Sequence, residues 1–166
     1  MINSSSGAGS AMYIHEMTRA ESERALEKAT LGRLGCARDN QPYVVPIYFA
    51  YDHEQLYSCV YGFATLGQKI EWMRSNPLVC LEIDERVSHD EWMSVLVYGR
   101  YEELSDTPEH AAARSQAHSL LERRAMWWEP AYVAAEHQSK EHLFAPIYYQ
   151  IHIDEITGHR ATPRQS

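Results

Sequence analysis

The chain has 166 residues, 45% of them hydrophobic, and a formal net charge of −8 with its histidines counted as neutral. This length predicts one domain with a sizeable core, and the acidic balance argues against general nucleic-acid binding, which needs a basic face. No apolar run approaches the roughly 18 residues of a membrane span. Three cysteines without a CxxC pair indicate buried thiols in a reducing cytoplasm.

The first expected elements follow a polar leader. Residues 1–12 (MINSSSGAGSAM) lack the hydrophobic core of a signal peptide, so we expect a disordered leader followed by a single domain over residues 13–166. Thr18-Arg-Ala-Glu21 has the pattern of a capping box, which predicts a helix over about 18–29. Leu31–Arg38 alternates in character and predicts the first strand.

The second expected strand carries an unusual proline. Residues 39–42 form a turn signal, and Tyr43–Tyr51 is rich in residues that favour strands. Because proline cannot donate to a ladder, Pro46 implies a sheet edge, a bulge, or a backbone that faces something other than a strand. A third strand is expected at Leu56–Tyr61.

The rest of the chain is expected to add helices and further strands. In order, these are a helix capped by Thr65 that runs to about Arg74, strands at Leu78–Ile83 and Trp92–Leu104, a helix from Asp106 to about Arg124, and a strand at Leu143–Ile156. Gly99 is a candidate bulge in the fifth strand. Strands this close in sequence are antiparallel. The order therefore predicts an α+β fold, a six-stranded antiparallel barrel with helices packed outside.

No complete catalytic or metal motif is present. His137 to His142 has one residue too many for an HxxEH pattern, and His110 and His118 share their helix face with Arg114, which repels a cation. The nucleophile elbow GxSxG and the dinucleotide fingerprint GxGxxG are both missing. We therefore expect no metal and assign no catalytic residue.

A phosphate site is the chemistry that the residues themselves favour most. The stretch GFATLGQKI resembles a nucleotide-binding loop but lacks its Gly-Lys-Ser/Thr ending. A helix start at Thr65 would present free N–H groups, Gly67 would let a ligand approach, and Lys69 would add a full charge. This fits a lone terminal phosphate better than a triphosphate. An ordinary capped helix with a surface lysine remains the alternative on spacing alone.

Several short segments occur together in one order, and this order resembles a known superfamily. The segments are Arg33–Ala37, Pro42–Ile47, Leu56–Ser58, Gly67–Glu71, Asn76–Cys80 and Ser94–Gly99, with a looser match at Ile151–Arg160. They resemble the pyridoxamine 5'-phosphate oxidase-like superfamily, in particular its nitroimidazole-resistance-like branch of flavin-binding proteins. The resemblance does not extend to the basic C-terminal signature expected of a true pyridoxamine phosphate oxidase.

The resemblance implies a split β-barrel that binds FMN at a homodimer interface. One matching strand would lie along the flavin ring, with its backbone reading the pyrimidine edge, and a lysine with two assisting residues would hold the phosphate. A second strand would face the cofactor from the other side, from the same or the partner subunit. The residues implied for the strand along the ring are Val45, Pro46, Ile47 and Tyr48. The lysine implied for the phosphate is Lys69, with Thr65 and Gln68 assisting. The residues implied for the second strand are Trp92, Ser94 and Val95.

The implied activity is a cytoplasmic oxidoreductase that acts on a small molecule, with a nicotinamide as electron donor. Trp127, Trp128 and Tyr132 would either wall the substrate pocket or simply pack beneath a loop. Two alternatives stay open: a deazaflavin-dependent reductase, and a flavin- or haem-binding carrier or sensor without turnover. A haem site would need an axial histidine, for which the candidates are His89, His142 and His152.

Overall fold

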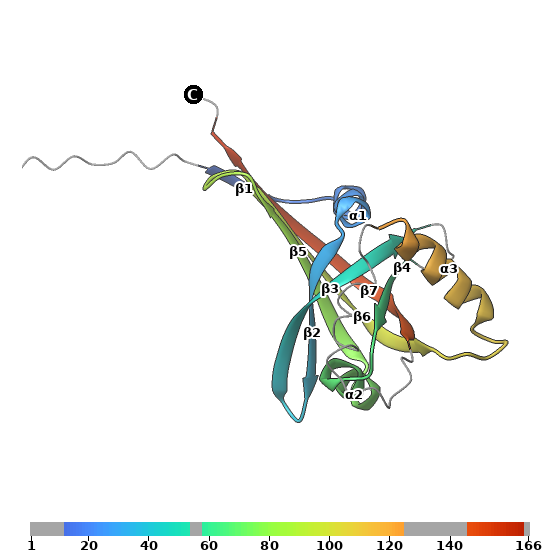
Figure 1. Cartoon of the computed structure of the whole chain (residues 1–166). Helices are drawn as coiled ribbons and strands as arrows, with labels where there is room; N and C mark the ends of the chain where they lie inside the picture. Colours follow the sequence, from blue (N-terminus) through green and yellow to red (C-terminus); the bar gives the residue numbers. More distant parts are fainter. Residues whose placement is uncertain (1–11, 54–57, 125–145, 165–166) are drawn as a thin grey trace, which may run out of the picture.

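The computed structural model describes residues 12–53, 58–124 and 146–164. Within these ranges the chain forms seven strands and three helices (Figure 1). In chain order they are β1 (Met12–Glu16), α1 (Arg19–Lys28), β2 (Leu31–Arg38), β3 (Gln41–Asp52), β4 (Cys59–Ala64), α2 (Gln68–Ser75), β5 (Leu78–Arg86), β6 (Trp92–Leu104), α3 (Ala111–Glu122) and β7 (Ile147–Pro163).

Six of the strands close into a ring. The sheet order is β1-β7-β4-β3-β2-β5-β6, every described pairing is antiparallel, and β7 also pairs with β6. The ring therefore consists of β7, β4, β3, β2, β5 and β6, as the sequence predicted, and the three helices lie outside it (Figure 1). The α+β class and the antiparallel barrel are confirmed.

Strand β1 is the element that the sequence did not predict. It pairs with the end of β7, from Met12 opposite Pro163 to Glu16 opposite His159. Strand β7 itself continues to Pro163, beyond the predicted end at Ile156, because β1 and β6 both supply partners there. Residues 1–11 of the expected leader lie outside the described residues, and Met12 opens β1.

The helix boundaries follow their caps. Thr18 caps α1 with both halves of the capping box in place, which confirms the first predicted helix. Helix α3 begins later than predicted, after His110, because residues 105–110 form short turns instead of the first helical turn. Strand β4 begins at Cys59, later than the predicted Leu56, although residues 54–57 lie outside the described part.

Alternate side chains of the strands point into the ring and form the core. Along β3 and β6 the odd-numbered side chains point inward, so Ile47, Phe49, Val95 and Val97 are buried. Cys36 and Cys59 are buried free thiols and Cys80 is half-buried. Gly99 lies at a register shift between β6 and β7, as expected of a bulge. No helix among the described residues is long and apolar enough to cross a membrane.

Candidate functional site

Strand β3 changes partners halfway along its length. Residues 41–48 pair with β2, whereas only residues 49–52 pair with β4, through Phe49 opposite Gly62 to Asp52 opposite Cys59. Strand β4 then leaves β3 and leads into α2. Among the described residues, the first half of β3 therefore has one edge without a strand partner, called the free edge below, and this is the split in the barrel.

Pro46 faces this free edge. The Phe49 amide donates to the Thr30 carbonyl oxygen at 3.2 Å, on the β2 side of β3. Because the backbone groups of successive strand residues face opposite edges, Pro46 and Tyr48 face the other way, where β4 no longer pairs. Among the described strands, the missing donor of Pro46 thus costs no ladder hydrogen bond, and of the three settings that this proline implied the structure shows a sheet edge.

The start of α2 lies just beyond the point where β4 leaves β3. Gly67 is the N-cap and no side chain caps the helix, so the prediction that Thr65 caps it is wrong. Thr65 lies two residues before the N-cap, and its hydroxyl makes no capping hydrogen bond. Next to Gly67 there is open space, since a Cβ atom there would meet no atom within 4 Å. The N–H groups of the first turn are therefore available to an anion.

Lys69 lies in the first turn of α2 and is only partly exposed. Burial lowers the pKa of its amine, and the nearby Cys36 thiol on β2 partly offsets this shift. Burial also raises the pKa of Cys36 itself, so the thiol is a poor source of negative charge. Within the described part of the chain, Lys69 makes no ion pair. A partly buried cation that lacks a counter-charge is unusual and favours an anionic ligand.

Neighbouring contacts hold α2 in place around this lysine. Arg74, at the other end of the helix, donates to both carboxylate oxygens of Glu103 at 2.7 and 2.8 Å. The Asn76 side chain donates to the Ala37 carbonyl oxygen at 2.9 Å. Trp72 packs on Tyr43 of β3 with ring centroids 5.5 Å apart. These supports were not anticipated from the sequence, because each joins residues distant along the chain.

The predicted residues on β3 and β6 divide between two faces. Ile47 and Val95 are 6% and 0% exposed and belong to the core, against which Val45 also packs. These three side chains therefore face the interior, and only their backbone groups lie along the strands. Pro46, Tyr48 and Ser94 lie on the outer face of the ring.

The predicted residues do not all meet within one chain. Pro46 and Tyr48 lie on the part of β3 that does not pair with β4, and Thr65, Gln68 and Lys69 lie in the turn and the helix that follow β4. Trp92 instead begins β6 and lies opposite Arg86 and Ala161, whereas α2 ends beside the later part of β6, where the Tyr101 amide donates to the Pro77 carbonyl oxygen. Trp92 and Lys69 are thus at opposite ends of the barrel.

The remaining predicted residues contribute little to this site. Trp127, Trp128, Tyr132 and His142 lie outside the described residues. His89 is exposed in a loop, and the His152 ring contacts the Glu102 carboxylate. Among the described residues, no group of three or more potential ligands could hold a metal ion.

A cavity that the sequence did not indicate lies elsewhere, beneath α1, and has a volume of about 680 Å³. It does not include Lys69 or the free edge of β3 at Pro46. Its lining combines residues of α1 with residues near the ends of β5, β6 and β7. No sequence pattern could have found it, because α1, the β5–β6 segment and Arg160 of the lining are each more than 50 residues from the next.

Known proteins resemble the chain in both sequence and fold. An uncharacterized protein from Rhizobium meliloti (strain 1021) is 42% identical over 150 residues, which cover 90% of this chain and 97% of the relative. The crystal structure of an FAD-binding protein from Mesorhizobium loti has a TM-score of 0.72 and 36% identity, and the match covers 92% and 99% of the two chains.

A more distant structure shows the same fold. A proposed 5-nitroimidazole antibiotic resistance protein from Bacteroides thetaiotaomicron has a TM-score of 0.63 at 19% identity, and the match covers 92% of each chain. The family model described as pyridoxamine 5'-phosphate oxidase matches residues 18–160. The chain therefore belongs to the pyridoxamine 5'-phosphate oxidase-like family of split barrels.

Proposed function

We propose that this protein is an FMN-binding flavoprotein whose phosphate site is the start of α2. The observation that carries the proposal is Lys69, a partly buried amine with no ion pair among the described residues. It stands in a helical turn whose N–H groups have no side-chain cap. A phosphate monoester would satisfy the amine and those N–H groups together.

The neighbouring strand fits the ring of a flavin. The free edge of β3 at Pro46 and Tyr48 carries backbone groups that no described strand pairs with, and the turn that leads into α2 follows the strand that separates from β3 there. A planar heterocycle with hydrogen-bonding edges could occupy such an edge. The relative from Mesorhizobium loti is described as FAD-binding, which supports a flavin. A single terminal phosphate suits the one lysine here, so we favour FMN.

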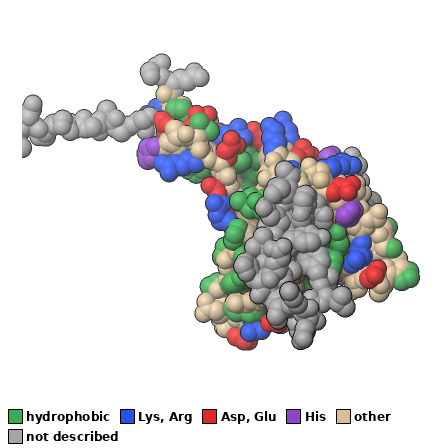
Figure 2. Space-filling view, in the orientation of Figure 1, with side chains coloured by type: hydrophobic (Ala, Val, Ile, Leu, Met, Phe, Trp, Pro, Cys, Tyr) green, Lys and Arg blue, Asp and Glu red, His purple; other side chains and the backbone are tan. Residues whose placement is uncertain are grey.

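We further propose that the protein is a homodimer. Leu31, Val44, Leu78 and Tyr98 are 47–64% exposed on the outer face of β2, β3, β5 and β6. Val44 and Cys80 both pair with Gly35, and Cys80 pairs with Tyr98, so an apolar row crosses four strands. Figure 2 shows hydrophobic side chains along the border of the molecule where β2 and β3 lie.

A dimer would also bring together the two parts of the predicted cofactor site, which lie apart within one chain. Within one chain Trp92 is remote from Lys69, so a second copy is needed if both residues are to flank one cofactor. Ser94, on the same outer face as Pro46, would then lie near the partner. Such a dimer would let the predicted residues of β3, α2 and β6 serve one site.

The proposed activity is reduction or oxidation of a small molecule with a nicotinamide electron donor. When bound, the flavin supplies the hydride and electron transfer, and the chain supplies position and charge. Lys69 and the N–H groups of α2 would hold the phosphate, and the edge of β3 would orient the ring. No described side chain is assigned as a catalytic acid or base.

The test begins with the visible absorbance spectrum of the purified protein. Flavin bands in stoichiometric amount, with FMN identified after acid release, would support the proposal. The protein should then oxidise NADH or NADPH when a small electron acceptor is present. A colourless protein that fails to bind added FMN would contradict it, and a deazaflavin or a haem spectrum would replace it.

A further inference from the structure

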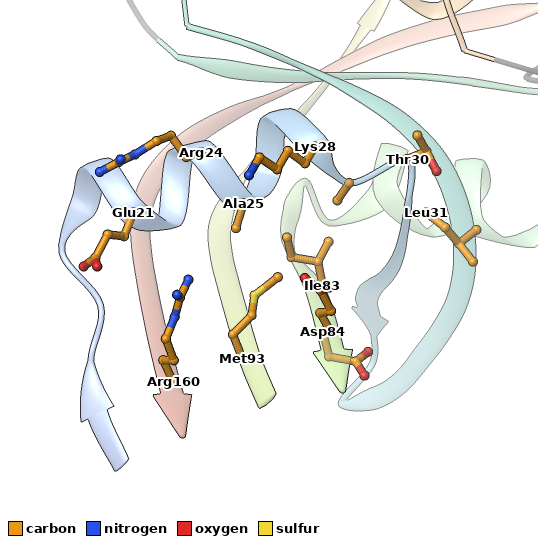
Figure 3. A pocket seen from close by; sticks show the side chains of 12 residues that line it. Glu21, Arg24, Ala25, Lys28, Thr30, Leu31, Ile83, Asp84, Met93 and Arg160 are labelled. Carbon is orange, nitrogen blue, oxygen red and sulfur yellow. The ribbon is translucent and has the colours of Figure 1, made fainter. Parts of the chain in front are cut away.

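The cavity beneath α1 is built like a small-molecule site. Its volume of about 680 Å³ falls within the range of ligand pockets in proteins. Figure 3 shows α1 as its roof, with Glu21, Arg24 and Lys28, and the ends of three strands as its floor. Arg160 and Met93 rise from that floor toward the underside of the helix. The space lies between a helix and an open end of the barrel.

Arg160 is the polar group that points to an anion. It lies on β7 opposite Met93, and its Nε is buried without a hydrogen-bond partner in the described structure. A buried donor of this kind carries the desolvation cost with no compensating bond. Neither Arg160 nor Lys28 makes an ion pair within the described ranges. Lys28 also lines the cavity, from the last turn of α1 (Figure 3).

Two of the carboxylates that line the cavity are already engaged. Glu21 accepts hydrogen bonds from the Thr18 amide and hydroxyl, both at 2.8 Å, and is held in the capping box. Asp84 is paired with Arg33 on the outer face of the sheet. Glu85 is the third lining carboxylate. The hydrogen bonds from Thr18 hold the pKa of Glu21 below its usual range, with smaller contributions from Arg160 and Arg24, so Glu21 keeps its negative charge. With Asp84 paired to Arg33, the three basic residues of the lining, Arg24, Lys28 and Arg160, are left with two carboxylates, those of Glu21 and Glu85.

Apart from Arg24 and Thr30, the rest of the lining is apolar. Ala25 of α1 lies above Ile83 and Met93, and Leu31 closes one side (Figure 3). We propose that this cavity binds a small organic acid, with its carboxylate between Arg160 and Lys28 and its apolar body against Ile83 and Met93. The cavity does not include Lys69, so this binding does not depend on the flavin proposal.

The experiment measures binding of hexanoate and hexanamide to the full chain by calorimetry. The two probes have the same apolar body and differ in the charge of the head. Wild-type protein should bind hexanoate at least tenfold more tightly than hexanamide, and added salt should weaken hexanoate binding. Inorganic phosphate, which has a charge but no apolar body, should bind at least tenfold more weakly than hexanoate.

Three variants test where the carboxylate of hexanoate binds. Arg160→Gln should remove the preference for hexanoate, and Lys28→Met should reduce hexanoate affinity severalfold. Arg100→Gln removes an exposed arginine that pairs with Asp154 and does not line the cavity, so it should leave hexanoate affinity unchanged. Circular dichroism and the thermal midpoint check the fold of each variant, and Lys28→Met decides the question if Arg160→Gln does not fold.

Three results would overturn the inference. They are the absence of saturable hexanoate binding, equal binding of hexanoate to hexanamide or phosphate, and unchanged hexanoate affinity in folded Arg160→Gln or Lys28→Met protein.

Discussion

Replacing Lys69 by methionine should weaken cofactor binding without destabilising the apoprotein. The amine is partly buried, burial lowers its pKa, and no described residue forms an ion pair with it. In the apoprotein, the charge of Lys69 therefore lowers the free energy of unfolding. Methionine removes this charge and keeps the aliphatic part of the side chain. We expect the free energy of unfolding of the apoprotein to stay unchanged or rise by about 0.5–1 kcal/mol.

The effect on FMN affinity follows from the loss of one charged donor. A hydrogen bond to a charged group contributes about 1.5–3 kcal/mol, which corresponds to a roughly 10- to 150-fold loss of affinity. The loss should not exceed this range, because the N–H groups of α2 remain. Riboflavin lacks the phosphate, so its affinity should be the same for wild-type and Lys69→Met protein.

The assay is fluorescence titration of the apoprotein with FMN and with riboflavin, together with urea unfolding of the apoprotein. Lys69→Arg keeps the charge and should retain most FMN affinity. Arg19→Gln removes an exposed charge that pairs with Glu23 and should change neither quantity by much. Equal losses for FMN and riboflavin would refute the phosphate assignment, and so would a loss of apoprotein stability above about 1 kcal/mol.

Three further predictions test the fold and the assembly. Arg74 holds the pKa of Glu103 below its usual range, so the pair stabilises the folded chain above the ordinary carboxyl value of 4.5 and loses this effect as the pH falls through the lowered pKa. Arg74→Ala should lower the free energy of unfolding by about 1 kcal/mol at pH 7 and by progressively less in acid, and a pH-independent difference would contradict this. Gly62→Ala should destabilise the protein by about 1–3 kcal/mol in urea unfolding, because the new Cβ would overlap the buried Tyr149 ring. Gly35→Ala is the matched control, since its Cβ would meet the movable Cys80 Sγ at 2.7 Å, and an equal cost at both sites would refute the steric argument. Val44→Glu should shift the proposed dimer toward monomer in sedimentation experiments while the exposed Glu85→Gln does not, and an unchanged dimer would exclude this face as the interface.

Patterns within short stretches of the sequence predicted the elements that depend on neighbouring residues. Strand β6 spans Trp92–Leu104 as expected, and Thr18 caps α1 as expected, because a strand period and a capping box involve residues close together in the chain. Pro46 also indicated an unpaired backbone by its chemistry alone. Lys69 was singled out from spacing and from resemblance, and its partial burial agrees with a functional position.

Only the tertiary structure shows which residues that are far apart in the chain lie close together. The sequence alone determined six of the seven described strands, the acidic balance, a proline that could not belong to a regular ladder and the lysine near a helix start. It could not predict β1 or the far end of β7, since residues about 150 positions apart pair there through backbone groups that carry no sequence signal. It could not show that Trp92 and Lys69 lie at opposite ends of the barrel, or that Arg160 lies beneath α1. These placements depend on closure of the ring, which is a property of long-range pairing and not of any short segment.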